Sequence, residues 1–380
     1  MTAMKYKRFL LSALCAVLLS GCGVTEEETP VPVTVQTFQN VSLDAGFDTV
    51  MTLTEQTDDA EGFYAHFETM CESFRRYNAL FDIYNDYEGI HNLKTINDMA
   101  GIEPVEVDPE LIELLVSAKE MYELSDGAFD ITIGSLLQVW HNYRTIGIAR
   151  NEAGQYGELP PEEELEEAAS HRGFEHVIID EENHTVYIDD PDISLDVGGI
   201  AKGFAAEYTA CTLEALGVDH AAINAGGNNR TLGSKVDGST WNVGIQNPDG
   251  AGSLFVVRVE GTNSFVTSGD YERFYLAEGD LRLHHIIDPQ TWYPSSRYRS
   301  VTVVTKNSAD ADCLSTALFL LPYAEGVALL ERYSDVSGNP ADAVWIAMDG
   351  SAFSGDNLHE QGEYVMAYTD GLKDRIVWGK

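Results

Sequence analysis

Short strand-like segments follow one another from Trp241 to Val304 with no helical stretch between them, and this run constrains the fold most. In each segment apolar residues alternate with polar ones or form a short continuous run, which is typical of β-strands. The predicted strands are residues 242–245, 255–259, 264–267, 273–276, 285–287 and 300–304. Because a parallel sheet needs a long crossover between successive strands, this pattern favours mixed or antiparallel sheets.

Helical patterns lie on both sides of this run. Apolar residues at helical spacing predict a helix over residues 58–81, and further helices are predicted over 110–124, 161–172, 200–216, 309–321 and 326–333. Residues 176–180 and 185–188 form a predicted hairpin, and other strands are expected at 193–197, 221–224, 343–348 and from 367 onward. Residues 125–159 contain five glycines and are expected to be a long functional loop. We therefore expect an α+β (mixed α/β) fold, with one layered domain over residues 41–380.

The N-terminus has the pattern of a lipoprotein signal. Lys5, Lys7 and Arg8 precede a short apolar run that ends in Leu-Ser-Gly-Cys at residues 19–22. A charged start, a short apolar stretch and small residues before a cysteine are typical of an exported chain that is cut at that cysteine. The apolar run is too short to span a bilayer comfortably.

We expect residues 1–21 to be a signal peptide and Cys22 to carry a lipid that anchors the chain to the extracytoplasmic face of the cell membrane. Residues 22–40, with three consecutive glutamates and two prolines, would form a tether. An ordinary signal peptide or an N-terminal membrane anchor is the alternative.

The chain is strongly acidic. It has 62 Asp and Glu against 23 Lys and Arg, a formal net charge of −39. Such a chain repels nucleic-acid backbones, so a nucleic-acid partner is not expected. It would also repel an anionic cofactor unless metal and backbone donors reverse the field locally. Cys71, Cys211 and Cys313 remain after the signal, at no metal-ligand spacing, and are expected to be buried free thiols.

Two glycine pairs follow predicted strand ends. Residues 194–203 read SLDVGGIAKG, so that Gly198-Gly199 opens a helix and Lys202 lies in its first turn. Glycines let the backbone approach a ligand closely, and a helix N-terminus offers free N–H groups and positive charge, which suits a pyrophosphate. The segment is neither a Walker A loop nor a G-x-G-x-x-G motif, and a plain strand–helix turn is the alternative. Residues 223–230, INAGGNNR, carry the second pair, for which a hairpin turn is the alternative.

Two more motifs place polar side chains at turns and on a helix. Residues 266–273, VTSGDYER, are followed by His284 and His285, of which only one can face a given site on strand alternation. Asp312 and Thr316 are four apart and so share a helix face, where a carboxylate and a hydroxyl suit Mg²⁺. Alternatives are a core or surface histidine and a helix N-cap at Asp310.

The order and wording of these four motifs resemble the ApbE family, the FAD:protein FMN transferases. Similar segments also occur at residues 47–49 (FDT), 81–84 (FDIY), 127–134 (GAFDITIG) with Trp140 downstream, and 241–248 (WNVGIQNP). The resemblance covers about residues 41–348 and implies an ApbE-like (T-fold-like) fold.

The resemblance also implies roles for single residues. His285 is similar to the family's catalytic base. The positions similar to FAD contacts are Phe47, Tyr84, Ala128, Phe129, Asp130, Asp196, Lys202 and Ile287. Those similar to the Mg²⁺ site are Gly199, Asp312, Ser315 and Thr316. Asn228 and Ser315 depart from the family, since aspartate occurs at each position in other members, and this leaves Asp312 as the only charged ligand in its helix.

The implied reaction transfers the FMN half of FAD to a Thr or Ser hydroxyl of an acceptor flavoprotein, with AMP released and Mg²⁺ as cofactor. Phosphoryl transfer needs positioning, charge neutralisation and proton removal more than covalent help. A Mg²⁺-dependent FAD pyrophosphatase would use the same residues with water in place of the acceptor. A flavin-binding lipoprotein without catalysis is the other alternative.

We predict that the mature protein begins at Cys22 and carries lipid there, because the apolar run ends directly before this cysteine. Intact-mass analysis of protein from the native membrane should show an acylated N-terminal cysteine, and Cys22→Ser should release the chain from the membrane fraction. A mature chain that starts at another residue, or a wild-type chain found free of membranes, contradicts the prediction.

Overall fold

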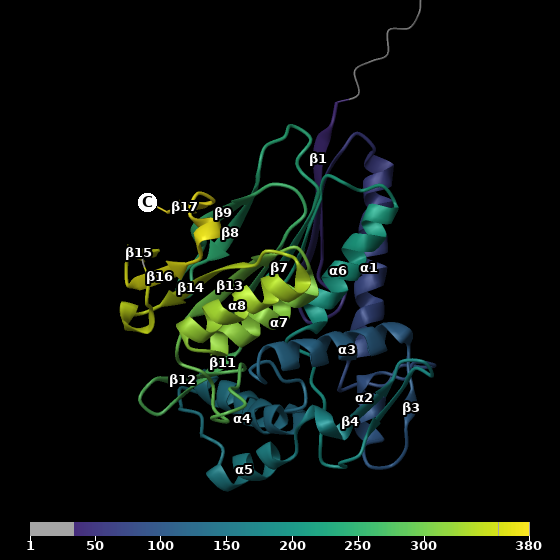
Figure 1. Ribbon diagram of the computed structural model, residues 1–380, viewed down its shortest axis with the longest axis vertical. Coiled ribbons are helices and arrows are strands. Elements are labelled where there is room, and N and C mark those ends of the chain that lie inside the picture. Colours follow the sequence, from purple (N-terminus) through teal and green to yellow (C-terminus); the bar gives the residue numbers. More distant parts are fainter. Residues whose placement is uncertain (1–33, 356, 380) are drawn as a thin grey trace, which may run out of the picture. The chain divides into compact units, whose positions relative to one another are not determined.

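A nine-stranded sheet is the centre of the part of the chain that the computed structural model describes, residues 34–355 and 357–379 (Figure 1). Each neighbouring pair of its strands is antiparallel. In spatial order the strands are β1 (Gln36–Ser42), β2 (Met51–Thr57), β6 (Ala221–Ala225), β7 (Asn228–Leu232), β10 (Ser264–Gly269), β13 (Ser300–Thr305), β14 (Asp342–Ala347), β16 (Tyr364–Tyr368) and β15 (Leu358–Gln361). The structure confirms the predicted α+β fold with antiparallel sheets.

Smaller sheets and short turns complete the strands. They are β3 (Val105–Glu106), β5 (Thr185–Ile188) and β4 (Val177–Asp180), then β17 (Ile376–Trp378), β9 (Ser253–Val259) and β8 (Trp241–Gln246), and the hairpin β11 (Phe274–Ala277) with β12 (Leu281–His284). Short 3₁₀ turns cover Phe174–His176, Gly350–Ala352 and Asp370–Leu372.

Helices cover one face of the nine-stranded sheet. Helix α6 packs between α1 and α7, and α7 lies against β10 and β13 (Figure 1). The helices are α1 (Ala60–Phe81), α2 (Leu93–Asp98), α3 (Pro109–Leu124), α4 (Gly134–Glu152), α5 (Glu162–Ser170), α6 (Ala201–Ala215), α7 (Ser308–Leu320) and α8 (Tyr323–Ser337). Helix α1 shows why the spacing works, since Phe63, Phe67, Met70 and Phe74 all lie on its buried face.

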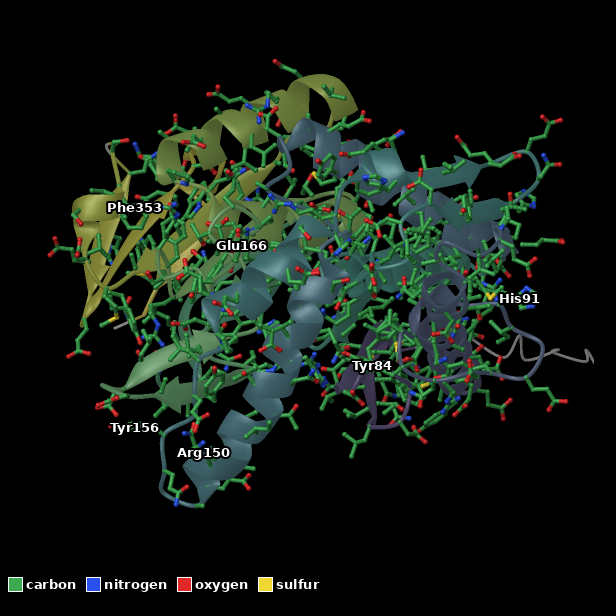
Figure 2. The ribbon with its side chains drawn as sticks, turned by 90° about the horizontal axis from the view of Figure 1, so that it is seen from below. Tyr84, His91, Arg150, Tyr156, Glu166 and Phe353 are labelled. Atoms are coloured by element: carbon green, nitrogen blue, oxygen red, sulfur yellow. The ribbon has the colours of Figure 1, made fainter. Side chains whose placement is uncertain are left out.

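The core divides into three clusters of buried apolar side chains. The largest joins α1, α3, α6 and α7 to one face of the sheet, and a second joins the opposite face to β8, β9 and β17. The third holds α4 and α5 against the β11–β12 hairpin around Trp140 and Tyr275. Figure 2 shows Arg150 and Tyr156 at the far end of this third cluster, where Tyr156 Oη donates to Asp280 Oδ1 at 2.8 Å.

The prediction of a long loop over residues 125–159 is wrong, because α4 occupies most of it. Its glycines permit close packing and do not mark a loop. A Cβ on Gly134 would lie 2.3 Å from the carbonyl oxygen of Ser194, and one on Gly147 would lie 2.4 Å from the ring of Tyr275. Leu136 and Trp140, both buried, hold the helix face between these two contacts.

Two predicted strands are also absent from the described residues. Residues 193–197 are extended but make only one isolated bridge, from Ser194 to Ile133. Strand β12 ends at His284, so residues 285–287 are a loop in which Ile287 makes an isolated bridge to Pro294. Both segments leave the sheets to reach the cavity described below.

The domain begins earlier than residue 41. Strand β1 pairs with β2 along its whole length, from Gln36 opposite Thr57, so residues 36–40 belong to the sheet and not to the tether. Residues from Val35 onward form one compact unit. The proposed signal peptide and Cys22 lie outside the described residues.

The three cysteines of the described chain are free thiols as predicted. Cys71 and Cys313 are buried, but Cys211 is exposed, so the expectation that all three are buried is wrong for it. No helix among the described residues has the length and apolar character needed to cross a membrane.

Candidate active site

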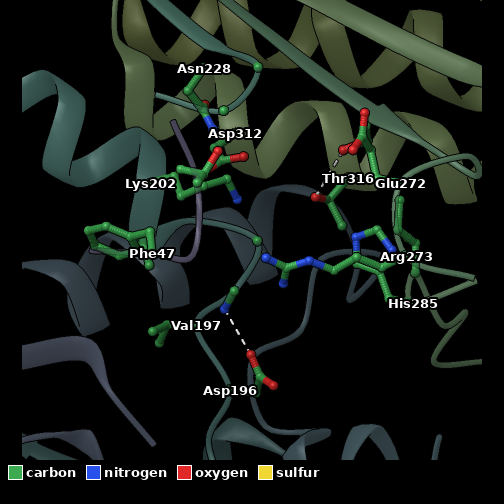
Figure 3. Close-up of a pocket in the computed structure, with 18 of the residues that line it drawn as sticks. Phe47, Asp196, Val197, Lys202, Asn228, Glu272, Arg273, His285, Asp312 and Thr316 are labelled. Carbon is green, nitrogen blue, oxygen red and sulfur yellow. Dashed lines mark hydrogen bonds between the residues drawn. The ribbon is translucent and has the colours of Figure 1, made fainter. Parts of the chain in front are cut away.

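A cavity of about 1140 Å³ lies where the two glycine turns, the start of α4 and the residues around His285 meet (Figure 3). Segments that are far apart in sequence contribute to its wall: residues 47–52, 81–87, 128–144, 194–202, 224–229, 244–246, 265–273, 285–289 and 312–320. All four sequence motifs therefore contribute residues to one space. Twelve of the thirteen residues predicted for catalysis, FAD contact or metal binding line it, and Ser315 does not.

The first glycine turn carries the chain between two side chains. A Cβ on Gly199 would lie 3.0 Å from the ring of Phe129 and 3.3 Å from Thr316 Oγ1, so glycine is needed for this approach. Asp196 closes the turn, since its Oδ1 accepts a hydrogen bond from the Gly198 N–H at 2.8 Å (Figure 3). Burial raises the pKa of Asp196 above its ordinary value.

Asp312 joins α7 to the beginning of α6. Its Oδ2 accepts a 2.8 Å hydrogen bond from the Gly203 N–H, which occupies one of the free donors at the start of that helix. Gly203 makes this contact possible, because a Cβ there would lie 2.6 Å from Asp312 Cβ. Burial raises the pKa of Asp312, while Lys202 and the Gly203 N–H oppose the shift. The predicted cap at Asp310 is wrong, since Asn307 caps α7.

Three hydroxyl groups, of Ser268, Ser315 and Thr316, lie beside Asp312. Ser268 Oγ lies 2.8 Å from Ser315 Oγ and 3.5 Å from Thr316 Oγ1. Ser315, fully buried, donates to the Asp312 carbonyl oxygen at 3.0 Å and does not line the cavity. Its hydroxyl therefore supports the wall, whereas Ser268 and Thr316 face the space.

The two adjacent histidines have separate environments. His284 is buried against Phe319; its Nε2 donates to the Ser295 carbonyl oxygen at 2.7 Å, and its Nδ1 accepts from the Ile286 N–H at 3.1 Å. His285 lines the cavity, and its buried Nδ1 has no hydrogen-bond partner in the described chain. The expectation that only one of them faces the site is confirmed by this geometry.

The imidazole of His285 is held neutral. Burial lowers its pKa well below the ordinary value of 6.5, and nearby positive charges reinforce the effect. These charges belong to Arg144, Arg273 and Lys202. A neutral imidazole with a free nitrogen is ready to accept a proton.

The positions similar to FAD contacts surround the same space. Tyr84 is 54% exposed at its rim (Figure 2), and its ring lies 5.6 Å from that of His141. Phe47 is held in the left-handed region at φ 58°, and its N–H donates to Asn78 Oδ1 at 2.6 Å. The remaining predicted contacts are the buried Ala128, Phe129 and Ile287 and the partly buried Asp130, whose pKa is raised by burial. The aromatic and aliphatic side chains among them suit a planar ring system.

The donors beside Asp312 fit a hard divalent cation. A buried carboxylate, the Thr316 hydroxyl and the backbone of Gly199 bring oxygen atoms together, which Mg²⁺ prefers. A single carboxylate leaves coordination positions for water and for phosphate oxygens. A separate group, His171, Asp190 and Asp192, has ligating atoms within 4.8 Å of one another but does not line the cavity.

Comparison with known proteins agrees with this site. A family model described as the ApbE family matches residues 47–338, well over half of the chain. The chain belongs to the ApbE family. A Treponema pallidum (strain Nichols) relative named FAD:protein FMN transferase is 37% identical over 273 residues, which are 68% of this chain and 71% of the relative. A Klebsiella pneumoniae (strain 342) relative of the same name is 32% identical over 291 residues, 74% of this chain and 84% of the relative.

Solved structures of the ApbE family have the same fold. The ApbE protein from Thermotoga maritima matches with a TM-score of 0.69 at 29% identity, over 82% of this chain and 94% of that one. The flavin transferase ApbE from Vibrio cholerae matches with a TM-score of 0.68 over 90% of this chain and 100% of that one. At 23% identity the second likeness concerns the fold alone.

Three lining residues were missed by the sequence reasoning. Ser268 and Arg273 lie within a motif that was recognised, but the role of each depends on which way a turn points. Arg144 lies on α4, in the segment expected to be a loop. The recurrence of apolar residues at 136, 140 and 147 was the available signal for that helix.

We predict that His285 remains neutral at a pH where surface histidines are already charged. Neighbouring aspartates raise the pKa of His171 and His176 above 6.5, whereas burial lowers that of His285. On acidification His171 and His176 should therefore titrate first and His285 last. The imidazole NMR signals, followed between pH 8 and pH 5 and assigned with His→Gln variants, test this order. A His285 signal that titrates above pH 6.5 in the ligand-free protein contradicts the geometry.

Proposed function

We propose that this protein transfers the FMN part of FAD to a threonine or serine hydroxyl of an acceptor protein and releases AMP, with Mg²⁺ bound at Asp312. The observation that carries the proposal is the place of His285, a neutral base with a free nitrogen in the cavity that also contains Lys202, Asp312 and Thr316 (Figure 3). The FAD:protein FMN transferases named among its relatives support the same reaction.

The pyrophosphate of FAD would bind at the Gly198-Gly199 turn. Ala201 and Gly203 at the start of α6 already donate their N–H groups to Val197 O and Asp312, so the positive end of the helix dipole and the charge of Lys202 would attract the anion. In a chain with net charge −39, such a local positive site is needed to bind an anion at all.

His285 would take the proton from the acceptor hydroxyl. A hydroxyl is a poor nucleophile until its proton is removed. His285 lines the cavity as an uncharged imidazole, which can accept that proton as a general base. Burial and the surrounding cations keep it unprotonated before the acceptor arrives. His141, the other cavity histidine, has its Nδ1 3.2 Å from Arg144 Nη2.

Asp312, Thr316 and Gly199 would hold Mg²⁺, which supplies charge neutralisation and a template for phosphate oxygens. Asp312 meanwhile keeps α6 in place through Gly203. The hydrogen bond to Gly203 holds Oδ2 of this carboxylate in place. Ser315 contributes by orienting its neighbours, since its hydroxyl is directed at Asp312 O and Ser268.

The proposed location is the extracytoplasmic face of the cell membrane, with the chain anchored by a lipid on Cys22. The support is the signal-like pattern of residues 1–22. Acceptors would be proteins or domains exposed on the same side. The acidic surface is consistent with a soluble domain held by a tether.

Asp312→Asn should remove most Mg²⁺-dependent transfer while the fold remains, because the amide oxygen still accepts from Gly203 but carries no charge. We expect the Mg²⁺ concentration for half-maximal activity to rise about tenfold or more, equivalent to about 1.4 kcal/mol of binding. Mass spectrometry of an acceptor domain incubated with FAD measures transfer, and Asp335→Asn on the exposed face of α8 is the control. Unchanged Mg²⁺ dependence in Asp312→Asn would falsify the metal assignment.

His285→Ala should bind FAD normally and lose transfer by about 10²- to 10⁴-fold, the usual contribution of a general base. Flavin fluorescence gives the FAD affinity and intact mass gives the rate. His176→Ala, which changes an exposed histidine far from the cavity wall, should behave as wild type. His284 is unsuitable as the control, because its two ring nitrogens hold the backbone around Ser295 and Ile286.

The same assay separates the alternatives. FAD split into FMN and AMP without any gain of acceptor mass would identify a pyrophosphatase. Intact FAD in the presence of Mg²⁺ and acceptor would identify a flavin-binding protein without catalysis. Either result overturns the proposed transfer.

A further inference from the structure

The cavity contains more positive charge than the proposed phosphate cradle uses. Besides Lys202, its wall includes Arg144 from the middle of α4 and Arg273 from the turn between β10 and β11. In Figure 3 the side chain of Arg273 is directed into the space that His285 and Lys202 also face. Both arginines therefore belong to the site, although no sequence motif suggested either role.

Neither arginine has a carboxylate partner among the residues that the structure describes. Arg144 makes one polar contact, from its Nη2 to His141 Nδ1, and Arg273 makes none. Arg172, Arg258 and Arg297 also form no ion pair within the described chain, but they do not line this cavity. Neighbouring arginines illustrate the contrast, since Arg299 pairs with Asp249 and Asp270.

The two acidic residues nearest to Arg273 in the sequence are Asp270 and Glu272, and neither forms an ion pair with it. Asp270 accepts hydrogen bonds from Arg299 at 2.8 Å and from Arg282 at 3.3 Å, so its charge is already neutralised. Glu272 is exposed and forms no ion pair within the described chain. Arg273 thus forms no ion pair within the described chain, although the carboxylate of Glu272 also lines the cavity.

The two arginines also act on one another. Burial lowers the pKa of Arg144, and the positive charge of Arg273 lowers it further. Arg144 is partly buried and Arg273 is exposed, and an anion bound between two guanidinium groups that repel each other stabilises both. Planar guanidinium groups bind phosphate oxygens with two parallel hydrogen bonds, so a phosphate is the ligand that fits best.

We propose that Arg144 and Arg273 form a charge clamp that binds non-bridging oxygens of the FAD pyrophosphate and stabilises the charge that develops as it breaks. This inference rests on the proposed FMN transfer. Arg144 and Arg273 are not among the residues that the family resemblance assigned to FAD binding, so their role in binding phosphate is additional.

The chemistry explains why such a clamp would act on the rate. The acceptor oxygen forms a bond to the FMN phosphorus while the bond from that phosphorus to the bridging oxygen breaks. The bridging oxygen keeps the electron pair and leaves on AMP, whose phosphate gains one negative charge, and the hydroxyl proton passes to His285. Donors placed where charge develops stabilise the transition state more than bound FAD.

The test uses Arg273→Gln and Arg144→Gln, with Arg282→Gln and Arg150→Gln as matched controls. Arg282 lies near Arg273 in the chain, and Arg150 is on the same helix as Arg144, but neither lines the cavity. Each cavity variant should lower kcat for FMN transfer by about 10²-fold, as loss of one such donor typically does, with a smaller change in FAD affinity. Arg→Lys at either position should recover part of the loss, because it restores charge without the planar donors.

Two further measurements do not depend on turnover. Inorganic pyrophosphate, titrated calorimetrically without metal, should bind more weakly to Arg273→Gln and Arg144→Gln than to the controls. The NMR pKa of His285 should rise toward its ordinary value in both variants, because each removes a charge that lowers it. A Gln variant that merely destabilised the fold would show a lower melting temperature. The Lys variant at the same position would then replace it in the kcat and pyrophosphate measurements.

The results separate this inference from the proposed function. Wild-type kcat and unchanged pyrophosphate affinity in both cavity variants would overturn the charge clamp while FMN transfer stands. Absence of transfer by the wild-type protein would overturn the proposed function, and the pyrophosphate and NMR results would then decide whether Arg144 and Arg273 bind an anion.

Discussion

The hydrogen bond from the Gly203 N–H to Asp312 fixes the active-site wall, because it ties the beginning of one core helix to the side of another. Helix α6 emerges from the Gly198-Gly199 turn, and α7 carries Thr316 one turn beyond Asp312. The absence of a side chain at Gly203 lets the two backbones approach, with Ser308 O only 2.3 Å from the place of a Cβ. A larger residue in place of Gly203 would push α6 away from α7. The phosphate turn before α6 would then move away from Asp312 and Thr316 on α7.

The cavity contains positively charged side chains, although the chain as a whole carries a large negative charge. Lys202, Arg144 and Arg273 line one cavity and form no ion pair within the described chain, although the carboxylates of Asp196 and Asp312 in the same wall lie near enough to attract Lys202 and Arg144. The same field keeps His285 neutral, so one arrangement both attracts the anionic substrate and preserves the base. Binding the pyrophosphate would relieve the repulsion among the cations, which makes part of the binding energy available before any new apolar contact forms.

Sequence reasoning succeeded where local chemistry and position coincide. Paired glycines and the Asp312/Thr316 spacing each have a physical meaning that does not depend on the rest of the fold. Strand alternation does not explain the different directions of His284 and His285, because β12 ends at His284. Sequence reasoning failed where a residue's meaning depends on distant neighbours. The glycines of residues 125–159 indicated a loop, but Gly134 is required for close packing against Ser194, and Gly147 and Gly157 for close packing against Tyr275. Ser315 has the right residue type and spacing for a ligand, yet Ser268 and the Asp312 carbonyl oxygen engage its hydroxyl on the inner side of α7.

Helix α4 has a mechanical consequence. Its first residue, Gly134, is held against Ser194, in the extended segment that leads to Asp196 and the phosphate turn. Arg144 lies ten residues further, about 15 Å along the axis. Because Gly134 is fixed against Ser194, α4 joins the segment that leads to the phosphate turn to the part of the cavity wall that carries Arg144. A change in the direction of α4 would therefore alter the position of Arg144 relative to that turn.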